Sequence, residues 1–376
     1  MAVPPGFRPA WVEVDLAALR HNVAVLRDVA APAEVMAVVK ADAYGHGAVP
    51  VAREVVEAGA AWLGVALVEE GVALREAGID APVMVLSEPP PDAASAVVAH
   101  GLTPVVYTLP GIEALAKAST GIDRRAPFPV HLKVDTGMHR VGCSVRDAPM
   151  LLESILDHDE LALGGICTHF AVADEPDDPY TRHQLARFDA LLHDLAARGV
   201  RPPVVHTANS AATIAFPDAR RDLVRCGIAV YGIAPSARVA PTTPLQPVLS
   251  FKTRVTHVKR VAAGERVSYG LRYRLDHDAN IATIPVGYAD GVPRNLGHLG
   301  GEVLVRGGRR PIAGTVTMDQ LMVDVGDGRV DVDDEVVLIG RQGDEEITAT
   351  EWAERLGTIP YEVVCGIGAR VPRGYR

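Results

Sequence analysis

Between residue 34 and about residue 232, short runs of apolar and β-branched residues alternate with stretches in which apolar residues recur three and four positions apart. This alternation is typical of βα units that build a parallel sheet. The pattern predicts strands at 35–39, 63–66, 83–86, 104–107, 130–134, 161–167, 204–207 and 223–225. It predicts helices at 49–58, 92–100, 111–118, 146–156 and 180–198, and an earlier helix at 15–29 with Asp15 as its N-cap.

Eight such strands predict an α/β fold, a closed (β/α)8 barrel of the TIM type over residues 12–240. An open, doubly wound sheet is the alternative. That fold has no positive support, because no GxGxxG motif follows the first strand and no GxxxxGK[ST] motif occurs in the chain.

The pattern changes after Ala234, where four prolines fall within thirteen residues. Valine-rich runs separated by turn residues follow at 251–258, 302–305, 321–325 and 335–339. We therefore predict a second, mostly β domain over residues 241–376, with a boundary near residue 240. Residues 1–11 are expected to join it.

Composition narrows the class of protein. With 376 residues the chain is long enough for two domains, and 37 basic against 47 acidic residues give a net charge of −10. The absence of a long basic run argues against nucleic acid or an anionic membrane as partner, so a small-molecule enzyme is expected. Four scattered cysteines and the lack of an apolar leader or membrane span predict a cytoplasmic protein.

In a barrel of this type, chemistry is carried by polar residues at the carboxyl ends of the strands. The residues at these positions are Lys40, Lys133, Arg140, His169, Asn209, Ser210 and Arg225. A lysine at the barrel mouth would be partly desolvated, and the lowered pKa would make its amine a nucleophile suited to a Schiff base. The alternative is a surface lysine that extends its ammonium into water.

The loops after the seventh and eighth strands suit a phosphate. Asn209 and Ser210 open the seventh helix, and Gly227 and Ile228 follow the eighth strand, so that backbone amides and a hydroxyl are available. Ser210 could equally be a simple helix cap. Pyridoxal 5'-phosphate requires both an amine for its aldehyde and a site for its phosphate, so we predict that the chain binds this cofactor.

Arg225 would then face the pyridine nitrogen of the cofactor. Arginine does not release its proton, so it would leave the ring nitrogen unprotonated and weaken the electron sink. Such a site favours rapid proton return over decarboxylation or transamination. A buried ion-pair residue is the alternative for Arg225.

Several motifs carry a resemblance to a known family. AVVKADAYGHGA around Lys40 is the most specific, and TGMHRVG, THFA, HTANSAA, RCGIAVYG, VSYG, GYADG, VTMDQ and YEVVCGIGARVPR follow in order. From residue 11 to residue 373 the chain resembles the alanine racemases, pyridoxal-phosphate enzymes of fold type III (EC 5.1.1.1). The resemblance implies interconversion of L- and D-alanine, the latter for bacterial peptidoglycan.

The resemblance also implies roles for individual residues. Lys40 would bind the cofactor covalently, and the phosphate would be held by Tyr44, Ser210, Gly227, Ile228 and Tyr361. Lys40 and Tyr269 would be the two bases, with His169 and Arg225 behind the tyrosine. Arg140, Met318 and Tyr288 would contact the substrate. Tyr269 would come from the partner subunit of a head-to-tail homodimer.

The chain departs from the family pattern at three positions. Thr315 stands where the family often has an arginine at the approach to the substrate, Cys226 where proline is usual, and His139 where glycine is frequent. The family also sometimes carbamylates a lysine at the position of Lys133. An unmodified lysine paired with Asp135 is the alternative.

Other functions fit less of the sequence. A decarboxylase of the same cofactor would usually place a glutamate where Arg225 stands, and a cofactor carrier would lack the second domain. A metal-dependent hydrolase would have to use His131, His139, His169 and His206, which do not show metal-ligand spacing. A racemase of broader specificity remains open, because one hydroxyl or methylene changes binding in an apolar pocket by only about 1–3 kcal/mol.

Overall fold

The computed structural model describes residues 7–121, 126–239 and 243–376. It forms two compact units. The first, here called the barrel unit, comprises Leu19–Ala43 and Ala48–Gln246, and the second, the β unit, comprises Met1–Ala18, Tyr44–Gly47 and Pro247–Arg376. The predicted boundary near residue 240 lies outside the described residues.

The barrel unit is built on eight parallel strands. They are β2 (Glu34–Val38), β3 (Trp62–Val65), β4 (Val83–Val85), β5 (Thr103–Val106), β6 (Phe128–Asp135), β8 (Leu161–Cys167), β9 (Val204–His206) and β10 (Leu223–Cys226). The sheet order is β10-β2-β3-β4-β5-β6-β8-β9, and the short β7 (Cys143–Ser144) adds to β6. Two backbone bonds nearly close the ring between its ends, from Asp222 N to Val205 O (3.1 Å) and from Arg225 N to Ala208 O (2.9 Å). The predicted barrel is confirmed.

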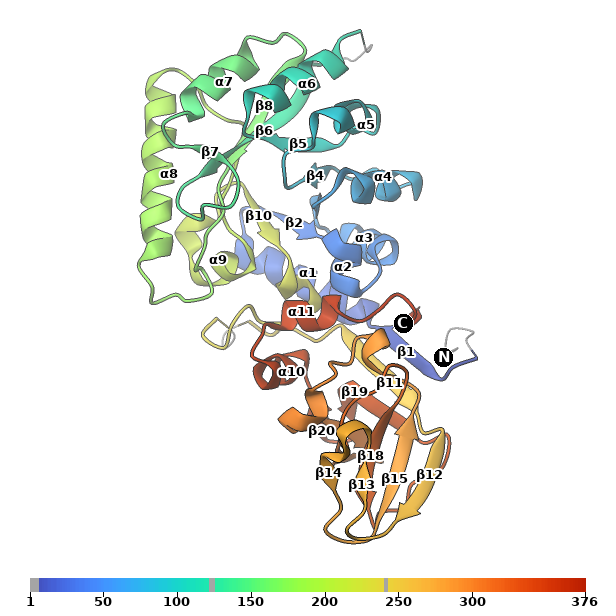
Figure 1. Cartoon of the computed structure of the whole chain (residues 1–376). Helices are drawn as coiled ribbons and strands as arrows, with labels where there is room; N and C mark the ends of the chain where they lie inside the picture. Colours follow the sequence, from blue (N-terminus) through green and yellow to red (C-terminus); the bar gives the residue numbers. More distant parts are fainter. Residues whose placement is uncertain (1–6, 122–125, 240–242) are drawn as a thin grey trace. The chain divides into compact units, whose positions relative to one another are not determined.

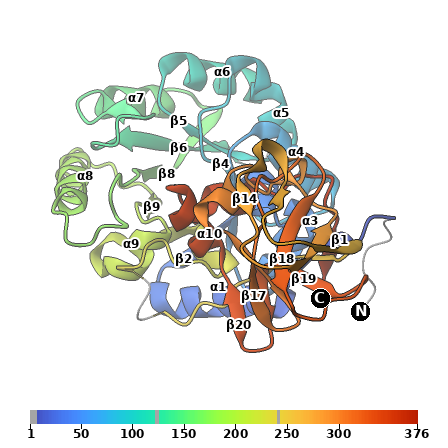
Figure 2. The same ribbon diagram turned by 60° about the horizontal axis from the view of Figure 1, so that its bottom comes forward.

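Helices lie on the outside of these strands (Figures 1 and 2). They are α3 (Ala48–Glu57), α4 (Val68–Glu76), α5 (Ala94–Ala99), α6 (Leu109–Ser119), α7 (Ala148–Leu156), α8 (Tyr180–Ala197) and α9 (Ser210–Ala215). The sequence pattern missed α4, which contains Gly71. A Cβ atom there would lie 2.8 Å from Leu102 Cδ1, so glycine lets this helix pack closely.

The helix that precedes the barrel strands begins as predicted. It is α1 (Leu16–Ala30), and the Asp15 carboxylate accepts a hydrogen bond from Ala18 N at 3.0 Å. Asp15 is therefore the predicted N-cap, which satisfies one of the free amides of the first turn.

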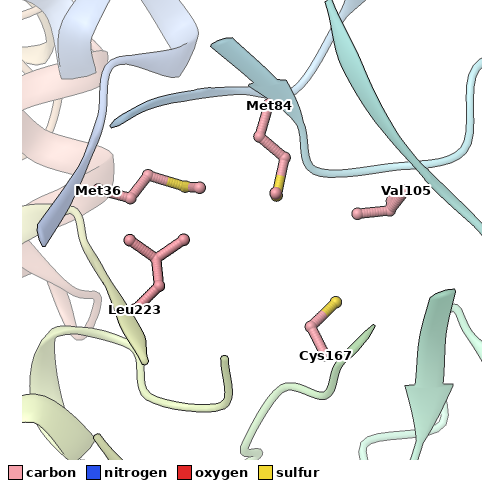
Figure 3. Close-up of a cluster of buried hydrophobic side chains, with 5 residues drawn as sticks. All are labelled: Met36, Met84, Val105, Cys167 and Leu223. Carbon is pink, nitrogen blue, oxygen red and sulfur yellow. The ribbon is translucent and has the colours of Figure 1, made fainter. Parts of the chain in front are cut away.

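Side chains fill the interior of the barrel. Met36, Met84, Val105, Cys167 and Leu223 come from five different strands and form a fully buried cluster (Figure 3). A packed interior leaves no passage along the barrel axis, so functional groups have to gather at the ends of the strands.

The β unit confirms the predicted, mostly β second domain. One sheet has the order β17 (Gly308–Pro311), β16 (Glu302–Val305), β19 (Glu335–Gln342), β11 (Leu249–Arg254), β1 (Ala10–Val14), β21 (Arg373–Tyr375), with β20 (Glu345–Ile347) added to β19. A second has the order β12 (His257–Val261), β15 (Ala279–Ile284), β18 (Leu321–Gly326), and β13 (Arg266–Val267) pairs with β14 (Tyr273–Arg274). The helices of this unit include α10 (Ala349–Leu356) and α11 (Pro360–Cys365).

The single strand predicted at 251–258 is wrong. The chain forms β11 and β12 in two different sheets, and it changes partner between them: Val255 N donates to Asp334 O, and Thr256 N donates to Thr283 O. The apolar alternation continues through the change, so the pattern could not reveal it. No helix in the described part of the chain combines the length and hydropathy of a membrane span.

Candidate active site

Lys40 begins an unusual left-handed turn directly after β2. It is the first residue of α2 (Lys40–Gly45), in which Ala41–Tyr44 have φ between 52° and 54° and Gly45 has φ 79°. Left-handed helical backbone costs about 1–2 kcal/mol for each residue other than glycine. Ala43 N donates to Val39 O at 2.8 Å and Ala41 N to Glu70 Oε1 at 2.6 Å, and both bonds hold the turn. Strain of this kind is typical of functional sites, where it fixes the direction of one side chain.

Positive side chains gather around His169 in the barrel unit. Burial is the main reason that the pKa of His169 lies well below its usual value, and the charges of Arg225, Arg140, Lys133 and Lys40 lower it further. Four cations from separate loops and strands thus act on one imidazole. Such a cluster indicates a site for an anion.

Lys133 belongs to this cluster, and its own pKa is shifted. Burial lowers its pKa to about 8, and the neighbouring charges of Arg225, Arg140 and Lys40 act in the same direction. Its ammonium donates to Leu86 O at 2.8 Å. Among the described residues, no ion pair joins Lys133 to Asp135, the alternative partner.

Asp135 instead organises the loop that carries Arg140. Its carboxylate accepts from Gly137 N (2.8 Å) and His139 N (3.1 Å), and the His139 imidazole lies 3.5 Å away. His139 has φ 56°, which explains why glycine suits this position. Arg140 is exposed and forms no hydrogen bond or ion pair with the other described residues, so it is available to a ligand.

Arg225 is buried, and both of its terminal nitrogens form hydrogen bonds within the protein. Nη1 bonds His206 Nδ1 and His206 O, each at 2.9 Å. Nη2 bonds Thr168 O (2.7 Å), Thr207 O (2.9 Å) and His169 Nδ1 (3.3 Å), so the predicted proximity of His169 and Arg225 is found. Within the described part of the chain, no hydrogen bond involves Arg225 Nε, which leaves one N–H of a rigidly held guanidinium for a further acceptor.

Two neutral histidines, His206 and His131, form a hydrogen-bonded chain that ends at Arg225. His206 Nδ1 accepts from Arg225, so His206 Nε2 carries the proton and donates to His131 Nδ1 at 3.0 Å. Burial lowers the pKa of His131 to about 4 and holds that of His206 well below its usual value. Among the described residues, no three His, Cys, Asp or Glu side chains are arranged to hold a metal ion.

The loops after β9 and β10 meet at Ser210. Its hydroxyl oxygen accepts from Gly227 N at 2.8 Å and from Ala229 N at 3.5 Å, which leaves the hydroxyl proton for another acceptor. Asn209 is the N-cap of α9, because its side chain accepts from Ala212 N at 2.9 Å. Ile228 starts a short 3-10 helix, whose first amides have no partner within the helix. The Ser210 hydroxyl proton and the Ile228 amide thus remain as donors that suit a phosphate, whereas the Gly227 amide already donates to Ser210.

The β unit carries the other predicted site residues, Tyr44 in α2, Tyr361 in α11, and Tyr269, Tyr288 and Met318 in turns and loops. Tyr44 and Tyr361 lie together, with 6.1 Å between their ring centroids. Tyr288 and Met318 lie on loops joined by bonds from Tyr288 N to Thr317 O (2.9 Å) and from Ala289 N to Met318 O (3.1 Å). Tyr269 is 70% exposed in the isolated chain.

Comparison with known proteins gives the family. The model of the alanine racemase N-terminal domain matches residues 14–235, and that of the C-terminal domain matches residues 248–375. The chain belongs to the alanine racemase family. The resemblance drawn from the sequence motifs is thus confirmed.

Individual alanine racemases match over nearly their whole length. The chain is 52% identical over 371 residues to the alanine racemase of Symbiobacterium thermophilum, with 98% of each chain covered. A solved alanine racemase from Bacillus anthracis has 42% identity and a TM-score of 0.92, covering 99% of this chain and 96% of that chain. A histidine racemase from Leuconostoc mesenteroides is similar at 33% identity and a TM-score of 0.90, with 99% of each chain covered.

Sequence reasoning did not find every residue that shapes the site. It treated His131 and His206 only as candidate metal ligands, although their positions on β6 and β9 could have suggested a contact across the barrel. It gave Thr315 no role of its own, yet the Thr315 hydroxyl donates to Tyr269 O at 2.8 Å. No signal in the sequence links two residues 46 positions apart in the chain.

Proposed function

We propose that this chain is a pyridoxal-phosphate-dependent racemase that interconverts L- and D-alanine. The observation that carries the proposal is the cluster of Lys40, Lys133, Arg140 and Arg225 around His169. In it the protein holds the terminal nitrogens of Arg225, which leaves only its Nε–H for a ligand. A cofactor with an anionic phosphate and a ring nitrogen suits a cluster of cations and N–H donors of this kind.

The residues divide the cofactor between them. In the absence of substrate Lys40 would bind it covalently, and its phosphate would be held by Ser210, Gly227, Ile228, Tyr44 and Tyr361. Arg225 Nε would donate to the ring nitrogen, with His169 beside it, and Asn209 caps the helix that would bind the phosphate. Pyridoxal phosphate, when bound, withdraws electrons from the α-carbon of the amino acid and so acidifies its α-proton.

This chain's own residues then move the proton. Tyr269 Oη removes the α-proton of L-alanine, and Lys40 Nζ returns one to the opposite face, which inverts the centre. The reverse reaction exchanges the two roles. Arg140 and the Met318 amide bind the substrate carboxylate, and Tyr288 lines the pocket. Because Arg225 keeps its proton, the electron sink stays weak and proton return is favoured over loss of carbon dioxide.

The proposal includes a head-to-tail homodimer. Tyr269 reaches the Lys40 of the partner subunit, so that residues 241–376, with residues 1–11, complete the neighbour's site. The high exposure of the Tyr269 ring in one chain supports this arrangement. The cytoplasmic location and the supply of D-alanine to peptidoglycan remain predictions.

Two substitutions test the roles of the bases. Tyr269→Phe is expected to bind the cofactor normally and to lose racemisation, because only the phenolic oxygen is removed. Lys40→Ala is expected to leave no borohydride-reducible link to the cofactor. Unchanged turnover in the first variant, or a reducible link in the second, would refute the assignment.

The second candidate is a racemase for a different or broader set of amino acids. The similar histidine racemase shows that this fold carries at least one other racemase, so family membership alone does not fix the substrate. A panel that includes alanine, serine and histidine distinguishes the two. The proposal requires alanine to be turned over with the highest kcat/KM.

A further inference from the structure

The segment 268–271, here called the Tyr269 turn, has positive φ angles that residues other than glycine rarely adopt. Ser268 (φ 66°), Gly270 (φ 76°) and Leu271 (φ 48°) are left-handed, and two of these three are not glycine. Tyr269 itself is 70% exposed, so packing against its own chain does not fix the direction of its side chain. The direction of the side chain therefore depends on what holds the backbone of the turn.

Thr315 holds this backbone at two points. Its carbonyl oxygen accepts from the Ser268 hydroxyl at 2.5 Å, and its own hydroxyl donates to Tyr269 O at 2.8 Å. Thr315 is only 3% exposed, which shields both bonds from water. The preceding Gly314 has φ 87°, and a Cβ atom there would lie 2.8 Å from Val267 O, so the two segments are in close contact.

His298 extends the chain of hydrogen bonds. Its Nε2 lies 2.9 Å from Thr315 Oγ1. The threonine hydroxyl has one proton and gives it to Tyr269 O, so Thr315 Oγ1 accepts here and His298 Nε2 donates. A donor on the oxygen strengthens the bond that the hydroxyl makes in turn.

We propose that Thr315 is a positioning residue for Tyr269, and that the chain from His298 through Thr315 to the Tyr269 carbonyl aims the tyrosine hydroxyl. The inference rests on the proposed function, since it assumes that Tyr269 moves the substrate proton on one face. Thr315 touches neither substrate nor cofactor in this scheme. Loss of the Thr315 hydroxyl should therefore slow proton transfer by Tyr269 and leave proton transfer by Lys40 unchanged.

D-Alanine in deuterated water separates the two faces. Lys40 removes the α-proton of D-alanine, and because its amine carries solvent deuterons it can return one to the same face, which gives deuterated D-alanine. Inversion to L-alanine requires Tyr269 as well. The ratio of inversion to exchange with retention therefore reports on the tyrosine face alone, whereas loss of folded or cofactor-loaded protein lowers both rates equally.

The cofactor-loaded full-length protein is compared with four variants. Thr315→Val removes the hydroxyl at nearly constant shape, and Thr315→Ser retains it. Ser268→Ala removes the second bond to the turn. Thr253→Val is the matched control, because Thr253 is also buried and its hydroxyl also donates to a carbonyl, that of Pro9, at 2.6 Å.

Thr315→Val is expected to lower the inversion-to-retention ratio about tenfold, less than the roughly hundredfold cost of a 1 Å misplacement. Ser268→Ala should lower the same ratio, and Thr315→Ser and Thr253→Val should keep the wild-type value. An unchanged ratio in both Thr315→Val and Ser268→Ala overturns the inference, as does an equal fall in Thr253→Val. Wild-type protein that holds the cofactor but does not invert alanine overturns the proposed function, and the inference with it.

Discussion

The low pKa of Lys133 predicts that this lysine is reactive toward carbon dioxide. Its pKa falls from the ordinary 10.5 to about 8. At pH 7 about one tenth of Lys133 would be the neutral amine, against about one part in 3,000 for an ordinary lysine, a difference of about 300-fold. Only the neutral amine can attack carbon dioxide, with loss of a proton, to form a carbamate. The product replaces a positive by a negative charge beside Arg140 and Arg225, which favours it.

Labelling with 13C-bicarbonate measures this directly. A carbamate carbon signal is expected from the wild-type protein, to be lost in Lys133→Met and kept in Lys252→Met, since the Lys252 ammonium is paired with Glu13 at 2.9 Å. The rate of labelling, at a fixed concentration of dissolved carbon dioxide, should reach half its maximum near pH 8. A midpoint near 10.5, or a signal that survives in Lys133→Met, would refute the reasoning.

The same pKa predicts the sign of a stability change. The folded Lys133 loses its proton near pH 8 and the unfolded one near 10.5, so the unfolded state binds more protons between these values. The free energy of unfolding should therefore rise with pH across this window, by about 3 kcal/mol relative to Lys133→Met. Urea unfolding of both proteins without added bicarbonate, at several pH values from 7.5 to 10.5, checks this, and parallel pH profiles would contradict it.

Two further substitutions follow from the hydrogen bonds of the site. Arg225→Met leaves the buried carbonyls of Thr168, His206 and Thr207 without their donor. Urea unfolding should show a loss of stability of about 3 kcal/mol or more. A loss below about 1 kcal/mol would show that these bonds contribute little. Ser210→Ala removes the one hydroxyl donor among the barrel-unit groups assigned to the phosphate. In a titration of the cofactor-free protein, it should weaken cofactor binding about 10- to 100-fold. Unchanged affinity would exclude Ser210 from the phosphate site.

The sequence alone predicted the barrel because its signal is local and repeated. Eight apolar runs recur along the chain, most of them beside an amphipathic stretch, and Asp15 precedes the first turn of α1, where a cap is needed. The same reasoning placed Lys40, His169, Ser210 and Arg225 at strand ends, because the barrel brings the ends of its strands together.

What the sequence could not show depends on contacts between distant segments or on unusual backbone. The four left-handed residues after Lys40 are all residues other than glycine, and Gly45 follows them, so the residue types do not predict the turn. Asp135 lies two positions after Lys133, which points their side chains to the same face of a strand, yet the aspartate turns to the loop amides. The bonds from Thr315 to the Tyr269 turn are fixed by tertiary packing alone.

Racemisation of alanine with solvent exchange is the central claim, and one incubation tests it most directly. The purified protein with pyridoxal phosphate is given L-alanine in deuterated water, and both enantiomers and their α-deuterium are quantified. We predict deuterated D-alanine and an approach to equal amounts of the two enantiomers. Neither inversion nor exchange, in protein shown to hold the cofactor, would contradict the account.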